Sequence, residues 1–521
     1  MRVAQRWLAA TLAVAVMASG APARQVAVEE QSIDTLRAML ATGRVSSVDL
    51  VRAYQARIAR MDRKGPRLHA VIALNPDALA QAKALDAERK AGRVRGDLHG
   101  IPVLIKDNIE TLDPVPTTAG SLALADNLTR RDAPVVARLR AAGAVILGKT
   151  NLSEWANIRS TRSMSGWSAV GGLVRNPYAL DRTACGSSSG SGAAVAASFA
   201  AAAVGTETDG SIVCPSAMNG LVGMKPSIGL VSRTHVVPIS HSQDTPGPMA
   251  RSVRDVAVML SAIVGADPAD PATAAAVPRD FAAGLSAQAL SGMRIAVRRP
   301  DMPRAVAARF DAALQVLRDA DAILVPVTEP KVDGIGEAEL VVLLTELKAD
   351  LNAYLASTPP AVTARTLDQV IAFNAARPAA EMPFFEQELF AQAAATRGLD
   401  DPAYKAARAK SLTAARGAID GMLREAHARV LVEPSYSPAW LSDPVHGDQY
   451  NGPSASQWPA IAGYPHLTVP MGLVLGLPVG LSFVAARDAD AVVLQAGYAY
   501  EQRAQARVRP GYAPSVEAGA R

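Results

Sequence analysis

Hydroxyl side chains gather in two glycine-containing loops near the middle of the chain. The first loop is Gly186-Ser187-Ser188-Ser189-Gly190, and the second is Thr208-Asp209-Gly210-Ser211. Glycine beside a hydroxyl lets backbone N–H groups approach a ligand closely. Residues 193–204, which join the loops, contain eight alanines and neither glycine nor proline, a composition typical of a tightly packed buried helix. The sequence thus predicts two hydroxyl-bearing loops on one rigid support. That arrangement suits a catalytic site, although serine and glycine also fill ordinary loops.

Three common kinds of site do not fit these loops. The first loop matches G-x-S-x-G, which would make Ser188 the nucleophile of an α/β-hydrolase, but that motif follows an apolar strand and residues 180–185 form a poor one. A phosphate-binding loop ends in Gly-Lys-Ser/Thr, unlike Gly190-Ser191-Gly192. The seven histidines show no H-x-x-x-H or similar spacing, so no metal site is predicted. What remains is a serine activated by a group other than histidine.

Lys106 is the candidate for that group. It follows the short apolar run Val103–Ile105, which is typical of a fully buried strand. A lysine in this place is either a solvated strand end or a buried amine. Burial disfavours the charged form and lowers the pKa of an amine, and only the neutral amine can act as a base. The sequence therefore allows a serine–lysine site that uses Lys106.

Strands and helices alternate around these residues. Residues 132–142 predict a helix and residues 144–147 a second buried strand, and this alternation predicts a mixed α/β core with helices on both faces. Residues 302–320 and 333–428 are rich in alanine, leucine and charged side chains, which predicts a mainly helical insertion or cap. Further apolar runs predict strands at Ile295–Val297, Ile323–Val325, Val430–Val432 and Val479–Val484.

The composition is that of a globular chain. Of its 521 residues, 49% are hydrophobic and 19% are charged, which excludes a disordered protein and predicts one large core with insertions, or two lobes. The net charge of +5 is spread without a dense basic run, so no nucleic-acid surface is predicted. Two cysteines, Cys185 and Cys214, do not make a disulfide framework. Each lies within three residues of a candidate serine, so they can be close, but we expect two buried thiols.

The N-terminus has the pattern of an export signal. Arg2 and Arg6 precede the apolar run Trp7–Ala18, and Ala21-Pro22-Ala23 offers an A-x-A cleavage site. These are the three parts of a secretory signal peptide, and the apolar run is too short to span a membrane. We expect residues 1–23 to be a signal peptide and residues 24–521 to be exported to the periplasm or secreted. The alternative is a retained interfacial anchor.

Six motifs occur in order along the chain: Gly100–Asn108, Gly186–Gly192, Gly205–Ser216, Gly223-Met224-Lys225-Pro226, Pro238–Arg251 and Ala460–Ser482. Together they make the chain resemble the amidase signature family over about residues 30–510. The resemblance implies an α/β amidase-signature fold: a mixed central β-sheet flanked by helices on both faces, with a helical insertion. It implies a single domain over residues 24–521, with a core of about 30–300 and 430–510 and a helical, substrate-side segment of about 302–428.

The resemblance implies a Ser–Ser–Lys triad. Ser211 matches the acyl-accepting nucleophile, Ser187 matches the bridging serine, which this family holds in a cis peptide, and Lys106 matches the base. The backbone N–H groups of residues 208–211 match the oxyanion hole. The two serines are 211 − 187 = 24 positions apart, which is the family spacing. This chain differs from many members at Glu207 and Asp209, where they have Asp and Gly.

Several neighbouring polar residues have expected supporting roles. Asp107 and Asn108 are candidates to orient the lysine loop. Asp244 and Arg251 are expected to form structural ties, as are the hydroxyls of the first loop other than Ser187.

The implied activity is hydrolysis of linear amides through an acyl-enzyme, without cofactor or metal. The runs Glu346–Leu355 and Glu381–Phe385 are similar to the peptide amidases of the family, which release ammonia from C-terminal peptide amides, so we expect small or peptidic amides as substrates. Tyr354, Phe384 and Phe385 either line a cleft for them or pack helices on the core. No added apolar membrane-binding segment occurs between residues 24 and 521, so no stable membrane insertion is expected. Oligomeric state is not predicted.

Other functions stay open at this point. A fatty-acid or aryl amide hydrolase would use the same triad. The family also includes the amide-hydrolysing component of tRNA-dependent amidotransferases, but that role is cytoplasmic and the signal peptide speaks against it. An exported amide-binding protein would keep the glycines without needing Lys106, Ser187 and Ser211 together.

Overall fold

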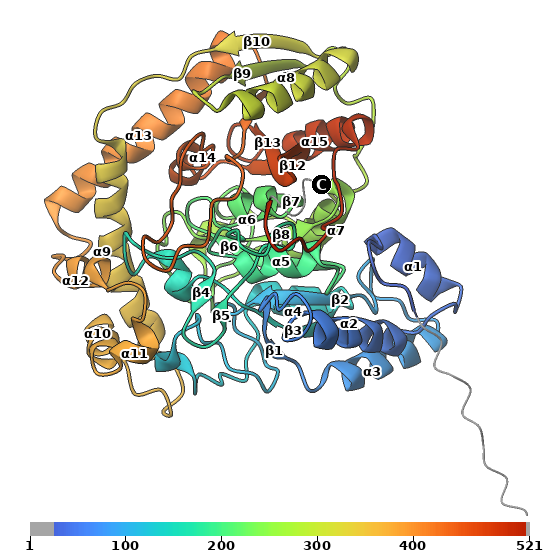
Figure 1. Ribbon diagram of the computed structural model, residues 1–521, viewed down its shortest axis with the longest axis vertical. Helices are drawn as coiled ribbons and strands as arrows, with labels where there is room; N and C mark the ends of the chain where they lie inside the picture. The colour runs from blue at the N-terminus through green and yellow to red at the C-terminus, as the bar shows by residue number, and fades with distance from the viewer. Residues whose placement is uncertain (1–25, 517–521) are drawn as a thin grey trace, which may run out of the picture.

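A mixed β-sheet runs through the molecule. The computed structural model describes residues 26–516, so the predicted signal peptide, residues 1–23, lies outside the described residues. Within them, eleven strands form one sheet (Figure 1). In spatial order its strands are β1 (Val71–Leu74), β3 (Val145–Thr150), β2 (Pro102–Lys106), β6 (Ala202–Glu207), β8 (Thr245–Ala250), β7 (Val222–Lys225), β12 (His466–Val474), β13 (Leu477–Val484), β11 (Val430–Pro434), β9 (Arg294–Arg298) and β10 (Ile323–Val327).

Parallel and antiparallel pairs both occur in this sheet. β2 lies between β3 and β6 and is parallel to both, whereas β8 is antiparallel to β6 and β7. Strands far apart in sequence also pair, since β7 is joined to β12 and β9 to β11. Because parallel strands end at the same edge of a sheet, the last residues of β2 and β6 lie side by side.

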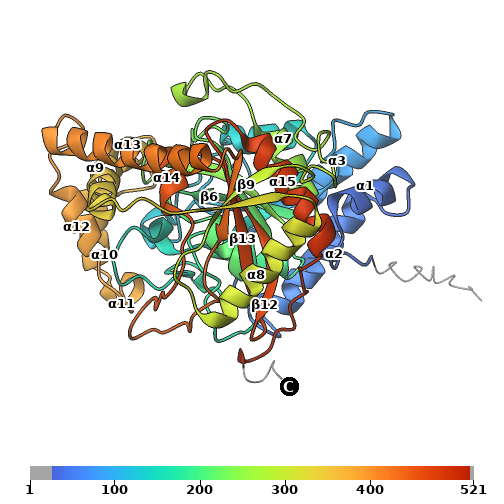
Figure 2. The same ribbon diagram turned by 90° about the horizontal axis from the view of Figure 1, so that it is seen from above.

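Helices cover both faces of the sheet, as predicted. α7 and α15 pack together on the central strands, with α4 and α8 beside them, and Figure 2 shows α8 next to α15. α5 and α6 contact each other and pack on β6 and β7 as a separate layer whose residues are all buried. The helices of the sheet layers and of the N-terminal region are α1 (Ile33–Ala41), α2 (Ser47–Met61), α3 (Ala78–Lys90), α4 (Pro134–Ala141), α5 (Ser189–Ala196), α6 (Val213–Met218), α7 (Val253–Ile263), α8 (Arg304–Asp319) and α15 (Asp490–Ala504).

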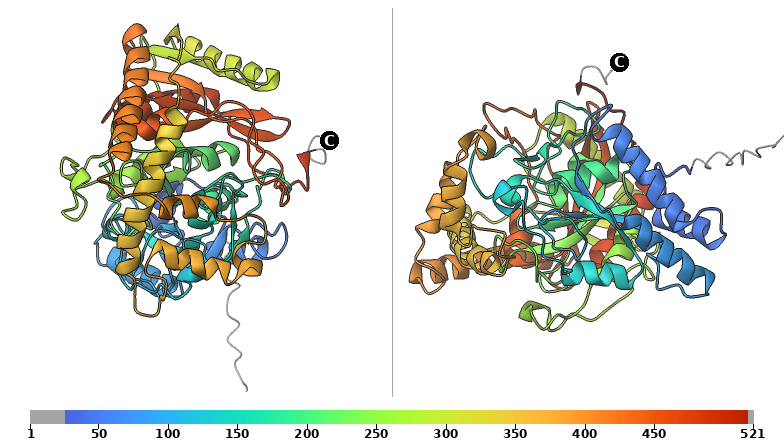
Figure 3. Two further views of the ribbon diagram at one scale, coloured as in Figure 1. Left: turned by 90° about the vertical axis from the view of Figure 1, so that its left-hand side faces the viewer. Right: turned by 90° about the horizontal axis from the view of Figure 1, so that it is seen from below.

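Of the predicted helical segment 302–428, the part from α9 to α13 lies on one side of the molecule (Figures 1 and 3). Its first part does not, since α8 packs on β12 and α15 and β10 is the edge strand of the sheet. α9 packs along α13 and also contacts α12, and apolar side chains of α9, α10 and α12 form a second hydrophobic core with Leu124 and Trp155 of the preceding part of the chain. None of the helices within residues 26–516 combines the length and apolarity needed to cross a membrane. The helices of this part are α9 (Ile335–Ala356), α10 (Leu367–Ala375), α11 (Pro378–Glu381), α12 (Glu388–Ala394) and α13 (Pro402–Glu425), and α14 (Gln457–Ala462) lies between β11 and β12.

Short elements complete the fold. A separate two-stranded sheet joins β4 to β5, and single 3₁₀ turns occur between the larger elements. These are β4 (Trp167–Ser168), β5 (Gly172–Leu173), η1 (Leu122–Leu124), η2 (Glu154–Asn157) and η3 (Pro271–Thr273).

The alanine-rich run 193–204 is not one helix, and that prediction was wrong. α5 ends at Ala196, and β6 begins at Ala202 in the middle of the sheet, between β2 and β8. Ser198, between them, has a positive φ of 56°, which no helix interior adopts. Alanine is compatible with the helix α5 and with the strand β6, because small side chains let the two elements pack closely. The spacing at Gly205 of β6 shows how close they are: a Cβ added there would lie 2.8 Å from Ser188 Oγ.

Candidate active site

The three residues predicted to do chemistry meet at one edge of the sheet. Lys106 is the last residue of β2, Ser187 lies in the loop before α5, and Ser211 lies in the turn between β6 and α6. The peptide bond before Ser187 is cis. Lys106 Nζ lies 2.7 Å from Ser187 Oγ, and the N–H of Ser188 donates to the carbonyl oxygen of Ser211 over 3.2 Å. The structure thus brings all three predicted residues into one place.

Lys106 is fully buried among neutral partners. Its Nζ lies 2.9 Å from Thr206 Oγ1 and 3.2 Å from the carbonyl oxygen of Thr206, in addition to its contact with Ser187. Burial lowers the pKa of Lys106 to about 7, and the more distant charges of Asp244 and Glu207 oppose that shift. Near neutral pH a large fraction of this amine is unprotonated, so it can accept a proton. Lys106 is therefore a buried amine, not a solvated strand end.

A second buried lysine provides a contrast. Lys149 on β3 is also fully buried, but its Nζ lies 3.3 Å from Asp107 Oδ1, 2.6 Å from the carbonyl oxygen of Ile109 and 2.9 Å from Thr117 Oγ1. Burial lowers the pKa of Lys149, and the charge of Asp107 opposes this. A carboxylate in contact stabilises an ammonium ion. Lys149 therefore fits a structural ion pair, whereas Lys106 fits a base.

The two residues after Lys106 hold its loop, as expected. Asp107 accepts hydrogen bonds from the backbone N–H of Thr118, at 3.2 Å, and from the Thr118 hydroxyl. Asn108 Nδ2 donates to Thr206 Oγ1 over 2.9 Å. Because that hydroxyl also contacts Lys106 Nζ, Asn108 helps to orient the partner of the candidate base.

Asp244 and Arg251 form the structural ties that were expected of them. Asp244 accepts a hydrogen bond from Thr208 Oγ1 at 2.6 Å and another from the N–H of Ile239 at 2.8 Å. Arg251 donates to the carbonyl oxygen of Val195 at the end of α5, 2.9 Å away. Asp244 thereby anchors the turn at residues 208–211 to the loop before β8, and Arg251 anchors α5 to the end of β8.

The other two hydroxyls of the first loop also have structural partners. Ser188 Oγ exchanges hydrogen bonds with the backbone of Thr206, at 3.1 and 3.2 Å. Ser189 Oγ donates to the carbonyl oxygen of Cys185. Both side chains fasten the loop to its surroundings, which agrees with the expectation that they are not the nucleophile.

The turn at residues 208–211 is clamped at both ends. Glu207 Oε2 accepts hydrogen bonds of 2.6 and 2.9 Å from the N–H groups of the two residues that follow Ser211. Gly210 has a φ of +74°, and a Cβ there would collide with the hydroxyl of Tyr436, so only glycine fits. Ser211 is 7% exposed. The clamp keeps the backbone of the turn in one conformation, which an oxyanion hole requires.

Carboxylate and amide groups that sequence reasoning missed lie around the turn at residues 208–211. Burial raises the pKa of Asp209, and burial together with the charge of Asp209 raises the pKa of Glu339 on α9 to about 8. Glu339 accepts hydrogen bonds of 2.9 Å each from Gln243 and Gln457. These residues come from separate elements, so no local pattern in the sequence indicates that they surround the turn.

The two cysteines form a disulfide, and the expectation of two buried thiols was wrong. Cys185 and Cys214 are bonded, with their Cα atoms 5.9 Å apart. They meet because the loop before α5 packs against the first turn of α6. The sequence did carry a signal for this pairing, since each cysteine neighbours one of the two serines that the family places together and the predicted compartment is oxidising.

The aromatic residues proposed for a cleft mostly pack the interior. Tyr354 is buried in the core of the helical segment, and its hydroxyl accepts a 2.9 Å hydrogen bond from Asn127. Phe385 is buried against Trp167, with ring centroids 5.4 Å apart. Phe384 is 42% exposed beside the same tryptophan. Packing on the core therefore explains Tyr354 and Phe385, and Phe384 alone of the three reaches solvent.

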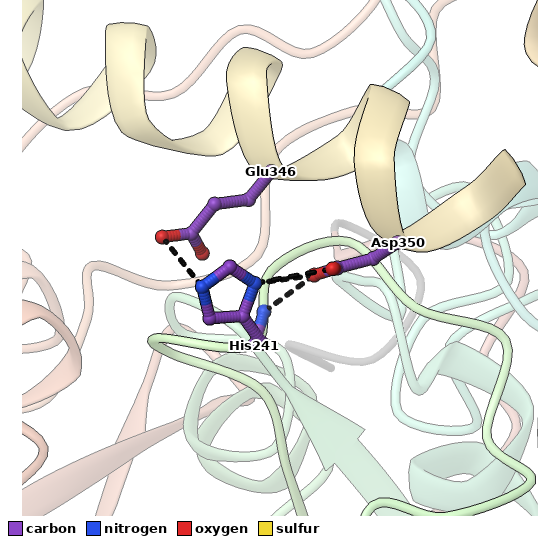
Figure 4. Close-up of side chains that lie close together, drawn as sticks. All are labelled: His241, Glu346 and Asp350. Atoms are coloured by element: carbon purple, nitrogen blue, oxygen red, sulfur yellow. Dashed lines mark hydrogen bonds and ion pairs between the residues drawn. The ribbon is translucent and has the colours of Figure 1, made fainter. Parts of the chain in front are cut away.

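His241 links the helical segment to the turn. Its Nδ1 lies 2.9 Å from Asp350 and its Nε2 lies 3.4 Å from Glu346, both on α9 (Figure 4). The three residues offer ligand atoms within 4.8 Å of one another, but both ring nitrogens already face carboxylates, as an imidazolium does in an ion pair. The hydrogen bond to Asp350 raises the pKa of His241. Through Asp244, the same loop contacts Thr208.

Comparisons with known proteins agree with this geometry. The Amidase family model matches residues 49–494. A probable amidase of Arabidopsis thaliana is 39% identical over 93% of this chain and 92% of its own length. An amidase family protein from Bacillus anthracis, known from its crystal structure, is 33% identical with a TM-score of 0.83, over 93% of this chain and 92% of that one.

Solved structures of peptide amidases extend the likeness. The native peptide amidase from Stenotrophomonas maltophilia is 48% identical with a TM-score of 0.89, over 94% of this chain and 100% of that one. A structure of the peptide amidase PAM with the competitive inhibitor chymostatin is 49% identical with a TM-score of 0.89, over 92% of this chain and 99% of that one. The chain therefore belongs to the amidase signature family and is a hydrolase that acts on carbon–nitrogen bonds in amides.

Proposed function

We propose that this protein is an exported amidase that hydrolyses small or peptidic amides through Ser211, Ser187 and Lys106 and releases ammonia. One observation carries the proposal. The Nζ of a fully buried lysine lies 2.7 Å from Ser187 Oγ, without a carboxylate in contact, at the sheet edge that also carries Ser211. A neutral amine, a bridging hydroxyl and a second hydroxyl in a rigid turn are the parts of an acyl-transfer site.

The proposed reaction passes one proton along these three side chains. Neutral Lys106 takes the proton of Ser187, which takes the proton of Ser211 as its Oγ attacks the amide carbonyl carbon. The backbone N–H groups of residues 208–211 donate to the oxyanion; loss of one such donor typically costs about 10²–10³ in rate. The proton then returns through Ser187 to the leaving nitrogen, which departs as ammonia. Water attacks the acyl-enzyme by the same relay and releases the acid.

Two features support a peptidic or small amide. The peptide amidases are similar to this chain at 48–49% identity over more than nine-tenths of its length. The site is also enclosed, because Ser187 is 1% exposed and Lys106 is 0% exposed. A small leaving group reaches such a site more easily than a long one.

Export is supported by two independent observations. Residues 1–23 have the pattern of a signal peptide, and the Cys185–Cys214 disulfide is a bond that persists in oxidising compartments. Cell fractionation with N-terminal sequencing of the protein tests this part of the proposal. A cytoplasmic protein that keeps residues 1–23 would contradict it.

A set of serine variants tests the proposed nucleophile. Ser211→Ala should abolish ammonia release and labelling by a serine-directed phosphonate, and Ser187→Ala should lower kcat by several orders of magnitude. Ser188→Ala, in the same loop, is the matched control and should keep most of the activity. Full activity of Ser211→Ala together with loss in Ser188→Ala would assign the nucleophile to the G-x-S-x-G serine instead.

A further inference from the structure

The disulfide joins the two loops that carry the candidate catalytic serines. Cys185 lies two residues before Ser187, and Cys214 lies three residues after Ser211. The bond closes 29 positions of sequence and brings the two Cα atoms to 5.9 Å. No other pair of cysteines exists in the chain. The single disulfide of this protein thus spans its proposed active site.

Each end of the crosslink is attached to a fixed part of the site. Cys214 is the second residue of α6, whose first N–H groups are held by Glu207. Cys185 has a φ of +56°, a conformation that side-chain-bearing residues rarely adopt. Its N–H donates to Thr183 Oγ1 over 3.0 Å, and its carbonyl oxygen accepts from Ser189 Oγ. A shift of Cys185 would therefore move Ser189 at the start of α5 and also Ser187, which lies between Cys185 and Ser189.

Apolar packing in the cluster of Cys185, Val213 and Met218 and two hydrogen bonds also tie these loops together. Asn219 Nδ2 donates to the carbonyl oxygen of Ala184 over 2.9 Å, and the N–H of Ser188 donates to Ser211 over 3.2 Å. Such bonds can open transiently, whereas a covalent bond cannot. The contact between Lys106 and Ser187, at 2.7 Å, is lost with a displacement of less than 1 Å, because hydrogen bonds weaken beyond about 3.2 Å.

We propose that the Cys185–Cys214 disulfide is a positioning element of the catalytic machinery, which holds Ser187 in register with Ser211 and Lys106. The proposal rests on the proposed function of these three residues. Misplacement of catalytic groups by about 1 Å can cost about 10²-fold in rate. Loss of the bond should therefore lower kcat about 10- to 100-fold and leave KM within about twofold, since substrate binding does not need the proton relay.

Two double variants and one control test the proposal. Cys185→Ala with Cys214→Ala removes the bond, and Cys185→Gly with Cys214→Ala also removes it while a glycine adopts the positive φ freely. Met218→Ala is the matched control, because its sulfur lies 4.0 Å from Cys214 Sγ in the same buried cluster and its loss leaves the crosslink intact. The measurements are kcat, KM, Tm and the pH dependence of kcat with an amidated peptide.

The expected result separates positioning from stability. Both double variants should remain folded at the assay temperature and lose kcat, with a changed pH dependence because Lys106 loses its contact with Ser187, while Met218→Ala keeps its kcat and pH profile. Unchanged kcat in the double variants would overturn the proposal, and so would an equal loss of kcat in Met218→Ala.

Reduction of the unmodified protein gives an answer even if the variants do not fold. Under a phosphine reductant, two free thiols should be counted as kcat falls, and reoxidation should restore it. Two free thiols with full kcat would overturn the proposal. That outcome leaves the proposed function standing if Ser211→Ala is inactive, whereas an active Ser211→Ala would reject the triad itself.

Discussion

Two fully buried lysines lie on adjacent strands and differ in what their Nζ atoms contact. Lys106 contacts hydroxyl and carbonyl oxygens, whereas Lys149 contacts the carboxylate of Asp107. Within residues 26–516 no anion contacts Lys106 Nζ, and burial lowers the pKa of Lys106 to about 7. The same residue type is therefore suited to accept a proton in one strand and to form an internal ion pair with a carboxylate in the next.

The pH dependence of turnover follows from the pKa of Lys106. Below pH 7 the amine is mostly protonated and cannot take the proton of Ser187, and above it the amine is neutral. We expect kcat/KM to rise with pH through an apparent pKa near 7, well below the ordinary value of about 10.4, and to reach a plateau. A pH–rate profile checks this, and a rate that still climbs at pH 10 would contradict a desolvated lysine base.

The contrast between the two lysines predicts that substitution of Lys106 affects turnover, whereas substitution of Lys149 affects stability. Lys106→Met should keep the fold and lower kcat by several orders of magnitude, because an apolar side chain suits the buried position but cannot act as a base. Lys149→Met should lower the free energy of unfolding by about 3–5 kcal/mol, because it leaves the buried Asp107 without its ion-pair partner. Thermal unfolding and kcat, measured on both variants, check the pair. A stable Lys149→Met or an active Lys106→Met would reverse the assignment.

At the scale of elements, a short loop couples the helical segment to the turn at residues 208–211. His241 contacts Glu346 and Asp350 of α9, and Asp244 contacts Thr208. The helical segment, which the sequence predicts as substrate-side, is thereby connected to the turn through one loop. These polar contacts, together with the hydrogen bond from Gln243 to Glu339 of α9, set the position of the helical segment against the turn.

The contact of His241 with α9 should weaken as the pH rises. The hydrogen bond to Asp350 raises the pKa of His241, burial and Arg233 oppose this, and Glu346 adds to it. Because the folded-state pKa is raised, the stabilisation is complete below the unfolded pKa of about 6.5 and is lost as pH rises through the folded value. The side chain is 45% exposed, so solvent screening limits the effect to less than about 1 kcal/mol.

Thermal unfolding at two pH values checks this contact. His241→Asn should lower Tm at pH 5.5 and have a smaller effect at pH 8.5. His427→Asn is the control, because His427 is exposed at the end of α13 and its positive φ suits asparagine; it should show no such difference. An equal loss of Tm at both pH values would indicate that the histidine acts through packing alone.

The elements were predictable where one signal dominated. Apolar runs at Ile295–Val297, Ile323–Val325 and Val430–Val432 became β9, β10 and β11, because short runs of branched apolar residues favour a strand. The runs in β9 and β11 are buried, whereas β10 is an edge strand with Ile323 47% exposed. The prediction of one helix over residues 193–204 was wrong because alanine is compatible both with a helix and with a strand that packs closely against a helix. The order of the sequence motifs, matched to the family, predicted that Lys106, Ser187 and Ser211 form one site. Glu339 could not be found this way, since it reaches the turn from the distant helix α9 by tertiary packing.

At the scale of the whole molecule, the eleven-stranded sheet joins the parts of the chain before and after the helical segment. β7 pairs with β12 and β9 pairs with β11, so residues before and after that segment share one framework. The candidate triad comes entirely from the first part of this framework, while Tyr436 from the second part packs on Gly210. Both parts must be assembled before the turn is fixed.

This enclosure predicts which amide bond the protein cuts. In the proposed mechanism the leaving nitrogen receives its proton from Ser187, and both serines are buried, with Ser187 1% and Ser211 7% exposed. An enclosed site of this kind admits ammonia as a leaving group more easily than a peptide chain. We expect the mature protein to release ammonia from a peptide that ends in an amide and to leave the internal peptide bonds of the same peptide uncut.

Assays of one peptide with and without its C-terminal amide distinguish release of ammonia from cleavage of internal peptide bonds. An ammonia assay combined with mass spectrometry should find the amidated peptide converted to the free acid of full length, and the unamidated peptide unchanged. Ser211→Ala serves as the blank for spontaneous deamidation. Fragments from internal cleavage would show that the leaving-group side accepts a chain. Turnover of long-chain acyl amides alone would assign the acyl side to lipids and reject the peptidic substrate, while the triad would stand, because the same relay hydrolyses either class.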